Sequence, residues 1–383
     1  MITKNKHRIF LSLFFFMSGI SFSTWASRIP TIKTFFNFNE AELGTILLAL
    51  PIGSLLGLPL SGWLVSRFNS RVPLAVGYGL NMVSLALIGF AQSTFTLVIA
   101  VMIFAFTTRI FNISVNTQAI TLQKLYDKKI IGSFHGYWST GGIAGIALST
   151  LFIALNISMQ LHFVIVGMLA LAATLYAYQF LLKDDRSTTG NKIMIRKPDP
   201  YIFFLGLIVF CSAICEGGMF DWSGIYFQEV IKVKIFTYGY LIFMTFMALS
   251  RFLSDAIIDR IGMQATYIMC SLFIVMGILL STVFPYFWTA MIGFSLVGFG
   301  TAAVVPMSYA LAGSSRKYSP GLAISIIATY SITGMLIGPP LIGYLAHAFG
   351  LRVSFIVFGI CGLMLVPISK MFFNHKKSID QTI

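Results

Sequence analysis

The sequence predicts an all-α membrane protein in which twelve membrane-spanning helices form two six-helix bundles. Composition is the first reason, because 57% of the 383 residues are hydrophobic and only 10% are charged. A soluble domain has about 25% charged residues, so a soluble globule, a disordered chain and a disulfide scaffold are all excluded. The other two reasons are the spacing of the apolar stretches and the recurrence of motifs from the first half in the second half.

A helix crosses a bilayer with about 20 mostly apolar residues. Stretches of at least that length, separated by short segments rich in turn residues, predict twelve spans. The start of the chain also resembles a secretory signal, since Lys4, Lys6 and Arg8 precede an apolar stretch. That stretch is long enough to span, so we expect it to be kept. The predicted spans are 9–34, 42–66, 72–91, 94–120, 132–155, 159–182, 201–228, 236–258, 265–284, 286–312, 320–346 and 350–373.

One connection is longer and more polar than the rest. Residues 183–199 carry several charges, Gly190 and Pro198, and almost no apolar side chain. This composition predicts a linker outside the membrane. The predicted domains are therefore an N-terminal six-helix bundle over 1–182, a cytoplasmic linker over 183–199 and a C-terminal six-helix bundle over 200–383.

The positive charges of the chain indicate its orientation. The net charge is +14, from 26 Lys and Arg against 12 Asp and Glu. Loops rich in Lys and Arg stay in the cytoplasm. With the N-terminus inside, four cations fall outside, at Lys33, Lys232, Lys234 and Arg352, and two lie within spans, at Arg28 and Arg109. Both termini are therefore expected in the cytoplasm, where 20 cations fall: Lys4, Lys6, Arg8, Arg67, Arg71, Lys124, Lys128, Lys129, Lys183, Arg186, Lys192, Arg196, Lys197, Arg251, Arg260, Arg316, Lys317, Lys370, Lys376 and Lys377.

An internal repeat supports two equivalent halves. A shift of 193 residues places Gly141 on Gly334 and Tyr137 on Tyr330. The same shift places Arg67, after the second span, on Arg260, after the eighth. Two parallel six-helix halves with a solute site between them are one plan of secondary transporters.

With these features the sequence resembles the major facilitator superfamily over nearly its whole length. The loop of this family after the second span reads G-x-x-x-D-R-x-G-R, and here it reads GWLVSRFNSR over residues 62–71. Ser66 replaces the acidic residue and Asn69 the second glycine. The corresponding loop after the eighth span matches the family pattern more closely, around Asp255, Asp259 and Arg260. The resemblance implies that these loop charges, with Arg67, take part in gating.

Three further motifs resemble the YbjJ-like branch of bacterial inner-membrane transporters. They are WASRIPTIK at 25–33, GSFHGYWSTGG at 132–142 and EGGMFDWSGIYF at 216–227. The Glu, Trp and Tyr pattern of the last motif is also similar to the fucose:proton symporter branch. The resemblance implies a bacterial inner-membrane transporter that works by alternating access, with spans one, four, seven and ten lining its cavity.

Charges inside a bilayer are expensive and are functional candidates for that reason. Glu216 lies near the middle of the seventh span. A carboxyl group in weakly polar surroundings can take up and release a proton near neutral pH. We interpret Glu216 as a proton site coupled to solute movement. The alternative is a carboxyl group that only bonds to a neighbouring helix.

Arg109 in the fourth span is followed by Asn112 and Asn116, three and seven positions later. This spacing puts the three side chains on one face of a helix. We expect this polar stripe of three side chains to bind an anionic or hydroxylated solute. We also expect Arg109 to pair with Glu216 when no solute is bound. The alternative is a cation that ties helices together.

Arg28 and Asp221 suggest an outer gate. The shift of 193 superposes them, and both lie in the outer third of their spans. We expect an ion pair between the two halves that opens and closes as the halves rock. The alternative is that the Arg28 side chain extends to the membrane surface.

Several aromatic and imidazole groups complete the predicted site. His135, near the start of the fifth span, titrates near neutral pH and is a candidate for coupling. Trp25 and Trp222 are candidates for stacking on a sugar face, although tryptophans also gather at membrane surfaces. Tyr226 belongs to the seventh-span motif and is a candidate solute ligand.

The preferred function is proton-coupled symport of a small polar organic solute, sugar-like or related. A proton-driven exporter of drugs or amphipathic metabolites is the alternative, and a non-transporting membrane sensor or scaffold is the alternative of another class. No P-loop, zinc motif or nucleophile elbow occurs, so no enzyme activity, cofactor or metal is expected. The four cysteines are expected to be free thiols. The expected partners are the solute, protons and lipid, without nucleic acid, and we expect a monomer.

Overall fold

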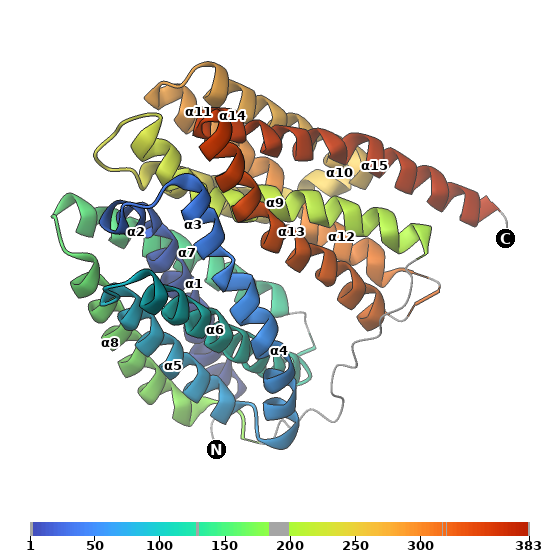
Figure 1. Cartoon of the computed structure of the whole chain (residues 1–383). Helices are drawn as coiled ribbons and strands as arrows, with labels where there is room; N and C mark the ends of the chain where they lie inside the picture. The colour runs from blue at the N-terminus through green and yellow to red at the C-terminus, as the bar shows by residue number, and fades with distance from the viewer. Residues whose placement is uncertain (1–2, 128–129, 184–198, 316, 319, 382–383) are drawn as a thin grey trace. The chain divides into compact units, whose positions relative to one another are not determined.

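The computed structural model describes residues 3–127, 130–183, 199–315, 317–318 and 320–381, and in these residues it contains helices and no strand (Figure 1). The chain divides into two compact units. Unit 1 is Met1–Asn37 with Ile46–Lys192, and unit 2 is Phe38–Thr45 with Ile193–Ile383. Most of the predicted linker lies outside the described residues, and the domain limits drawn from the sequence stay predictions.

Unit 1 is built from long helices joined by short connections. α2 follows α1 after a break at Arg28, and the chain passes from α3 (Glu40–Leu47) into α4. The helices of unit 1 are α1 (Lys4–Ser27), α2 (Ile29–Phe36), α4 (Ala49–Arg67), α5 (Arg71–Gly89), α6 (Thr94–Gln123), α7 (Ile131–Ala154), α8 (Met159–Ala177) and the short 3₁₀ turn Tyr178–Phe180.

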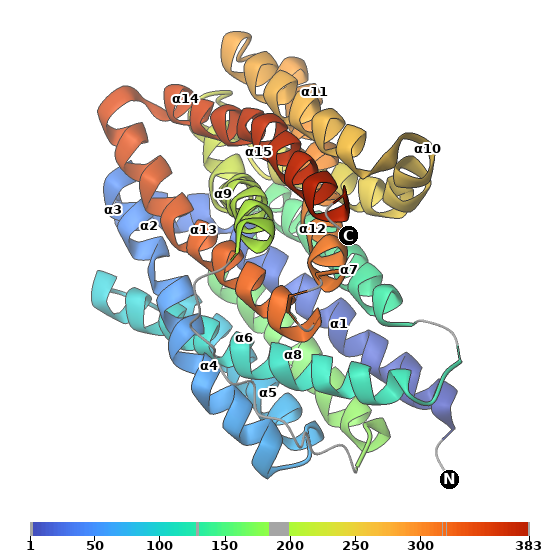
Figure 2. The same ribbon diagram turned by 90° about the vertical axis from the view of Figure 1, so that its right-hand side faces the viewer.

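Unit 2 has the same kind of construction. α13 and α15 lie beside α9, and α10 lies beside α11 (Figure 2). The helices of unit 2 are α9 (Pro200–Glu229), α10 (Tyr238–Val283), α11 (Phe287–Ala302), α12 (Val304–Gly313), α13 (Pro320–Phe349), α14 (Leu351–Ser354) and α15 (Ile356–Gln381).

Eleven helices in the described part of the chain are long and apolar enough to cross a membrane, against the twelve that the sequence predicts. The difference lies in α10, whose 46 residues contain a non-helical glycine, Gly262, with φ of 79°. The parts before and after Gly262, 238–261 and 263–283, each have about the length that a bilayer requires. A glycine adopts this backbone conformation without the clash that a side chain would cause, so Gly262 ends one helix and allows the next to begin.

Helix starts follow local signals in the sequence. Ser93 and Thr96 form a reciprocal capping box at the start of α6, which satisfies two backbone N–H groups. Asp199 accepts a hydrogen bond from the backbone of Ile202 at 3.1 Å, and Pro200 takes the first helical position of α9. These caps position α6 and α9, the helices that carry Arg109 and Glu216.

The two units repeat the same helix contacts. α1 packs on α7 in unit 1 as α9 packs on α13 in unit 2, and α4 packs on α6 as α10 packs on α11. Glycines make the first contact possible, because a Cβ atom at Gly141 would overlap the carbonyl of Phe16 and one at Gly334 would lie 2.7 Å from the carbonyl oxygen of Phe210. Without a side chain, each lets two helix backbones approach closely.

The glycine contacts near the middle of these helices follow a shift one residue longer than the sequence repeat. Gly141 and Gly334, 193 residues apart, meet Phe16 and Phe210, which are 194 residues apart. α1 ends at Ser27, directly before Arg28, whereas α9 continues to Glu229. The superposition of Arg28 on Asp221 therefore stays a prediction.

Candidate functional site

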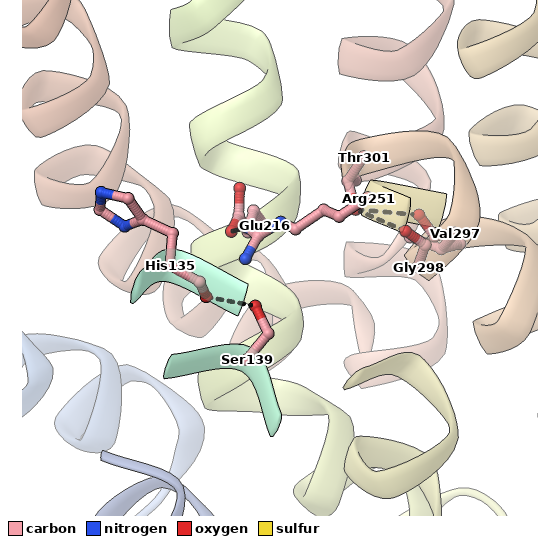
Figure 3. A network of polar contacts seen from close by, with 7 residues as sticks. All are labelled: His135, Ser139, Glu216, Arg251, Val297, Gly298 and Thr301. Carbon is pink, nitrogen blue, oxygen red and sulfur yellow. Dashed lines mark hydrogen bonds and ion pairs between the residues drawn. The ribbon is translucent and has the colours of Figure 1, made fainter. Parts of the chain in front are cut away.

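Glu216 and Arg251 form an ion pair within unit 2. Glu216 lies in α9 and Arg251 in α10, and Nη2 of Arg251 donates to Oε1 of Glu216 at 3.2 Å (Figure 3). The carboxylate side chain is 12% exposed and the guanidinium side chain 30% exposed. Each charge thus has a partner of opposite sign in surroundings that water reaches poorly, which is how ions persist inside a membrane protein.

Local packing explains why these two side chains meet. Gly218, two residues after Glu216, faces α15, where a Cβ atom would overlap the ring of Phe358. Residues two apart point to nearly opposite sides of a helix, so Glu216 points away from α15. On α10, Phe243 and Met247 pack against Gly298 of α11, and Arg251 follows one turn after Met247. Figure 3 shows the Arg251 side chain extending toward Glu216.

Arg251 is the residue whose position the sequence analysis judged wrongly. It was counted among the cytoplasmic cations, but it lies inside α10, well before the break at Gly262. The signal was present, because the predicted span 236–258 already contained it. Tyr309 of α12 is also close enough to Glu216 for the two groups to interact electrostatically. The site in unit 2 therefore contains a carboxyl group and a guanidinium group from two helices.

The other predicted groups of α9 have different surroundings. Asp221 is 8% exposed, and its side chain makes no hydrogen bond or ion pair within the described residues of unit 2. Tyr226 is fully buried, and its hydroxyl donates to the carbonyl oxygen of Ser281 at 2.7 Å. Trp222 is also fully buried, and its indole N–H has no acceptor among the described residues. Tyr226 thus joins α9 to α10 within unit 2.

In unit 1, Arg109 of α6 donates from Nε to Oγ of Ser54 in α4 at 2.8 Å. The contact follows from small residues on α4, since a Cβ atom at Gly57 would lie 3.1 Å from Cβ of Arg109. Asn116 donates to the backbone carbonyl of Asn112 at 2.8 Å. The side-chain amide of Asn112 has no hydrogen bond among the described residues of this unit. Arg109 is therefore tied to a neutral hydroxyl group within its own unit.

Arg28 is buried at 4% exposure, so its side chain does not extend to the surface. Its Nε donates to Nδ1 of His162 at 3.1 Å, and its Nη2 donates to the carbonyl oxygen of Ile157 at 2.8 Å. Nε2 of His162 lies 3.5 Å from Oγ of Ser149. Nδ1 accepts a hydrogen bond only from a neutral ring, which puts the imidazole proton on Nε2. The pairing of Arg28 with Asp221 stays a prediction.

The remaining predicted residues have the following surroundings within their own units. His135 is exposed, packs edge-on to Phe15 with ring centroids 5.7 Å apart, and accepts at its backbone carbonyl from Ser139 (Figure 3). Trp25 is 2% exposed, and its ring centroid lies 6.1 Å from that of Phe104. Its indole N–H has no acceptor among the described residues. The predicted gating residues of the loops are exposed, and their side chains make no ion pair within the described part of the chain: Arg67, Asp255, Asp259 and Arg260.

Three residues that contact the predicted charges were not predicted from the sequence. They are Arg251, which contacts Glu216, His162, which contacts Arg28, and Ser54, which contacts Arg109. His162 and Ser54 are single polar residues within apolar segments. A charged residue predicted inside a span requires a polar partner, and this requirement is the signal that could have prompted a search for them. Their identity still depends on which helices pack together.

The fold and these buried charges define a membrane transporter of many spans, and the comparisons name its family. The profile of the Major Facilitator Superfamily matches residues 11–317, and the chain belongs to this family. An uncharacterized MFS-type transporter of Yersinia pestis is 30% identical over 361 residues, which are 93% of this chain and 92% of that protein. The membrane protein MosC of Rhizobium meliloti is 28% identical over 371 residues, covering 95% of this chain and 89% of MosC.

Solved structures share the fold at low sequence identity. A bacterial homolog of the human lysosomal transporter Spinster, in an inward-facing and occupied conformation, aligns with a TM-score of 0.73 at 15% identity, over 96% of both chains. The nucleoside transporter NupG aligns with a TM-score of 0.71 at 14% identity, over 95% of this chain and 98% of its own. The chain is thus a transporter of small molecules and not an enzyme, as its sequence predicts.

Proposed function

We propose that this transporter carries a small polar organic solute together with a proton across the bacterial inner membrane, by alternating access and with both termini in the cytoplasm. The single observation that carries the proposal is the ion pair between Glu216 and Arg251, on two neighbouring helices of unit 2. Glu216 is the proton site and Arg251 is its counter-ion.

The pair couples protonation to helix contact. An ionised Glu216 attracts Arg251 strongly because little water screens the two charges. A proton on Glu216 removes the negative charge and most of that attraction. The contact between α9 and α10 is therefore stronger in one protonation state than in the other. A transporter whose two conformations differ in such a contact binds the proton with different affinity in each, which is the requirement for coupling.

The polar stripe of α6 supports a hydrophilic solute. Arg109, Asn112 and Asn116 place a guanidinium group and two amides on one helix face, and Asn112 keeps hydrogen-bonding capacity within its unit. Amide and guanidinium donors suit hydroxyl and carboxylate groups better than the apolar surface of a drug. This composition favours uptake of a metabolite over export of amphipathic compounds.

The test begins with a solute screen and ends with proton movement. Purified protein is screened against metabolites by thermal shift, because a ligand that binds the folded state raises its Tm. Proteoliposomes then carry a pH-sensitive dye inside, and the solute that was found is added outside. We expect internal acidification with the wild-type protein and none above the level of empty vesicles with Glu216→Gln.

The matched control is Asp127→Asn, which removes an exposed carboxylate far along the chain from Glu216. This variant should acidify the vesicles at the wild-type rate. If Glu216→Gln also acidifies them at the wild-type rate, proton coupling through Glu216 is wrong.

A further inference from the structure

Two cations of unit 1 converge on one aromatic ring where α1 begins. Nζ of Lys4 lies 5.1 Å from the centroid of the Tyr126 ring, and Cζ of Arg8 lies 5.7 Å from the same centroid. Lys4 and Arg8 are one helical turn apart on α1, and Tyr126 follows the end of α6. Both distances are within the range of a cation–π contact. The ring thus holds two positive charges close to each other.

Hydrogen bonds fix this arrangement and leave donors available. The hydroxyl group of Tyr126 donates to Oδ1 of Asn5 at 3.0 Å, and Nη2 of Arg8 donates to Oγ of Ser133 in α7 at 3.2 Å. A guanidinium group and an ammonium group each carry several N–H donors. Within the described residues, the ammonium group of Lys4 donates no hydrogen bond and the guanidinium group of Arg8 donates no other. Most of these donors are therefore available to a ligand.

No carboxylate pairs with either cation in the described part of unit 1. Asp127, the acidic residue directly after the aromatic ring, is exposed and makes no ion pair with a described residue. Like charges one turn apart on a helix repel each other, so Lys4 and Arg8 destabilise α1 unless an anion lies near them. The sequence of the same segments adds only further cations, at Lys6, Lys124, Lys128 and Lys129.

Exposed apolar side chains lie next to the cations on both segments. Ile9, directly after Arg8, is 62% exposed, and Leu125, directly before Tyr126, is 50% exposed. The cations also lie at the start of the candidate span Lys4–Phe36. A free phosphate ion has no apolar part to cover such side chains, whereas a phospholipid presents an anionic headgroup and acyl chains together. The combination of positive charge and exposed apolar surface favours a lipid.

We propose that Lys4, Arg8 and Tyr126 bind the headgroup of an anionic phospholipid, whose phosphate oxygens accept hydrogen bonds from the two cations. The parallel N–H donors of a guanidinium group match two oxygens of a phosphate. Each cation near the membrane surface raises the affinity for anionic lipid by about fivefold. The proposal is independent of proton coupling, because none of these residues lies in unit 2 with Glu216.

The experiment measures the Tm of the purified full-length protein in detergent micelles that contain increasing mole fractions of phosphatidylglycerol. A ligand that binds the folded state raises its Tm. We expect a saturable rise with the wild-type protein, a smaller rise with phosphatidylcholine of the same acyl chains, and none with inorganic phosphate. In Lys4→Gln, the mole fraction of phosphatidylglycerol that gives half of the rise should be about five times higher.

Lys6→Gln is the matched control. Lys6 is exposed, lies two residues from Lys4 on α1 and carries the same charge, but its side chain makes no cation–π contact with Tyr126. Lys6→Gln should need the same mole fraction of phosphatidylglycerol as the wild-type protein. A general attraction between the chain and anionic lipid would weaken equally in both variants. Equal responses of Lys4→Gln and Lys6→Gln would therefore overturn the proposal.

A measurement on the wild-type protein complements the variants, because replacing Arg8 would also remove its bond to Ser133. Salt screens exposed charges, so the mole fraction of phosphatidylglycerol that gives half of the rise should increase with ionic strength. The response to phosphatidylcholine should not change with salt. A phosphatidylglycerol response independent of salt would contradict the proposal. A rise in Tm with inorganic phosphate as large as with the lipid would also contradict it, because it identifies a site for free phosphate.

Discussion

Arg28, Arg109 and Arg251 each lie within a candidate span, and each has a different kind of partner in its unit. Arg251 meets a carboxylate, Arg109 meets a hydroxyl group, and Arg28 meets an imidazole and a backbone carbonyl. A guanidinium group paired with neutral acceptors keeps its full charge, whereas one paired with a carboxylate forms a neutral unit. This difference is why the proposed proton coupling involves Arg251 and not Arg28.

At the residue scale we predict that His162→Ala destabilises the protein. The change removes the acceptor of a buried guanidinium donor, and a buried donor left without a partner costs about 1–3 kcal/mol. Thermal unfolding of the purified protein in detergent should show a lower Tm. His162→Gln, whose amide oxygen can accept the same hydrogen bond, should recover part of the loss.

Ser149→Ala is the matched control for this prediction. It removes the longer contact to the other ring nitrogen, at 3.5 Å, together with the bond that Ser149 donates to the carbonyl oxygen of Gly145 in its own helix, at 2.8 Å. The acceptor of Arg28 stays in place, so the Tm should change less than in His162→Ala. An unchanged Tm for His162→Ala would show that Arg28 does not depend on this acceptor.

At the scale of helices, glycine rows determine which helices pack together. Gly141 and Gly145 of α7 face Phe16 and Ile20 of α1, so the two backbones come into contact. In a membrane, helices associate largely through such close packing, because apolar side chains gain little by leaving lipid. The contacts of α1 with α7 and of α9 with α13 therefore rely on the absence of side chains.

We predict that Gly141→Ala prevents correct folding. The added methyl group would overlap the backbone carbonyl of Phe16, which cannot move without displacing α1. The amount of monodisperse protein after fluorescence-detected size-exclusion chromatography measures the effect, and we expect a loss of most of it.

Gly136→Ala, on the same helix, is the control. A Cβ atom there meets nothing within 4 Å, so the change should be tolerated, and the better helix propensity of alanine stabilises by about 0.5–1 kcal/mol. Similar yields from the two variants would contradict the packing role of Gly141.

At the scale of the whole molecule, the charges outside the spans determine orientation. Most cations lie at loops and ends that are predicted on one side of the membrane, while the few in the apolar interior have specific partners. The positive-inside rule relates the first group to topology. The proposed transport mechanism involves the second group.

Reporter fusions test the proposed topology. Green fluorescent protein fused after Ile383 should fluoresce, because it folds in the cytoplasm. Alkaline phosphatase inserted between Lys232 and Lys234 should be active, because it folds outside. Activity of the phosphatase at the C-terminus and not at the 232–234 loop would reverse the orientation.

Much of the fold could be predicted from the sequence, for a definite reason. A helix in lipid must satisfy its own backbone hydrogen bonds, so each span is encoded by a continuous apolar segment that can be recognised without its neighbours. The helix count differs because α10, over Tyr238–Val283, contains two segments of spanning length that meet at the kink of Gly262. The candidate site was predicted less completely: Glu216 and Arg109 were identified from their charge, but none of their partners was.

The sequence by itself determined the family and the all-helical architecture, and it predicts an orientation, because composition, span length and charge placement act locally along the chain. Tertiary structure decided what each buried charge contacts. Arg251 reaches Glu216 across 35 residues of chain, and Arg28 reaches His162 across 134. These contacts depend on which faces of two helices meet, and one residue of register turns a side chain by about 100°. That sensitivity is why the fold was predicted correctly while the partners of Arg28 and Arg251 were not.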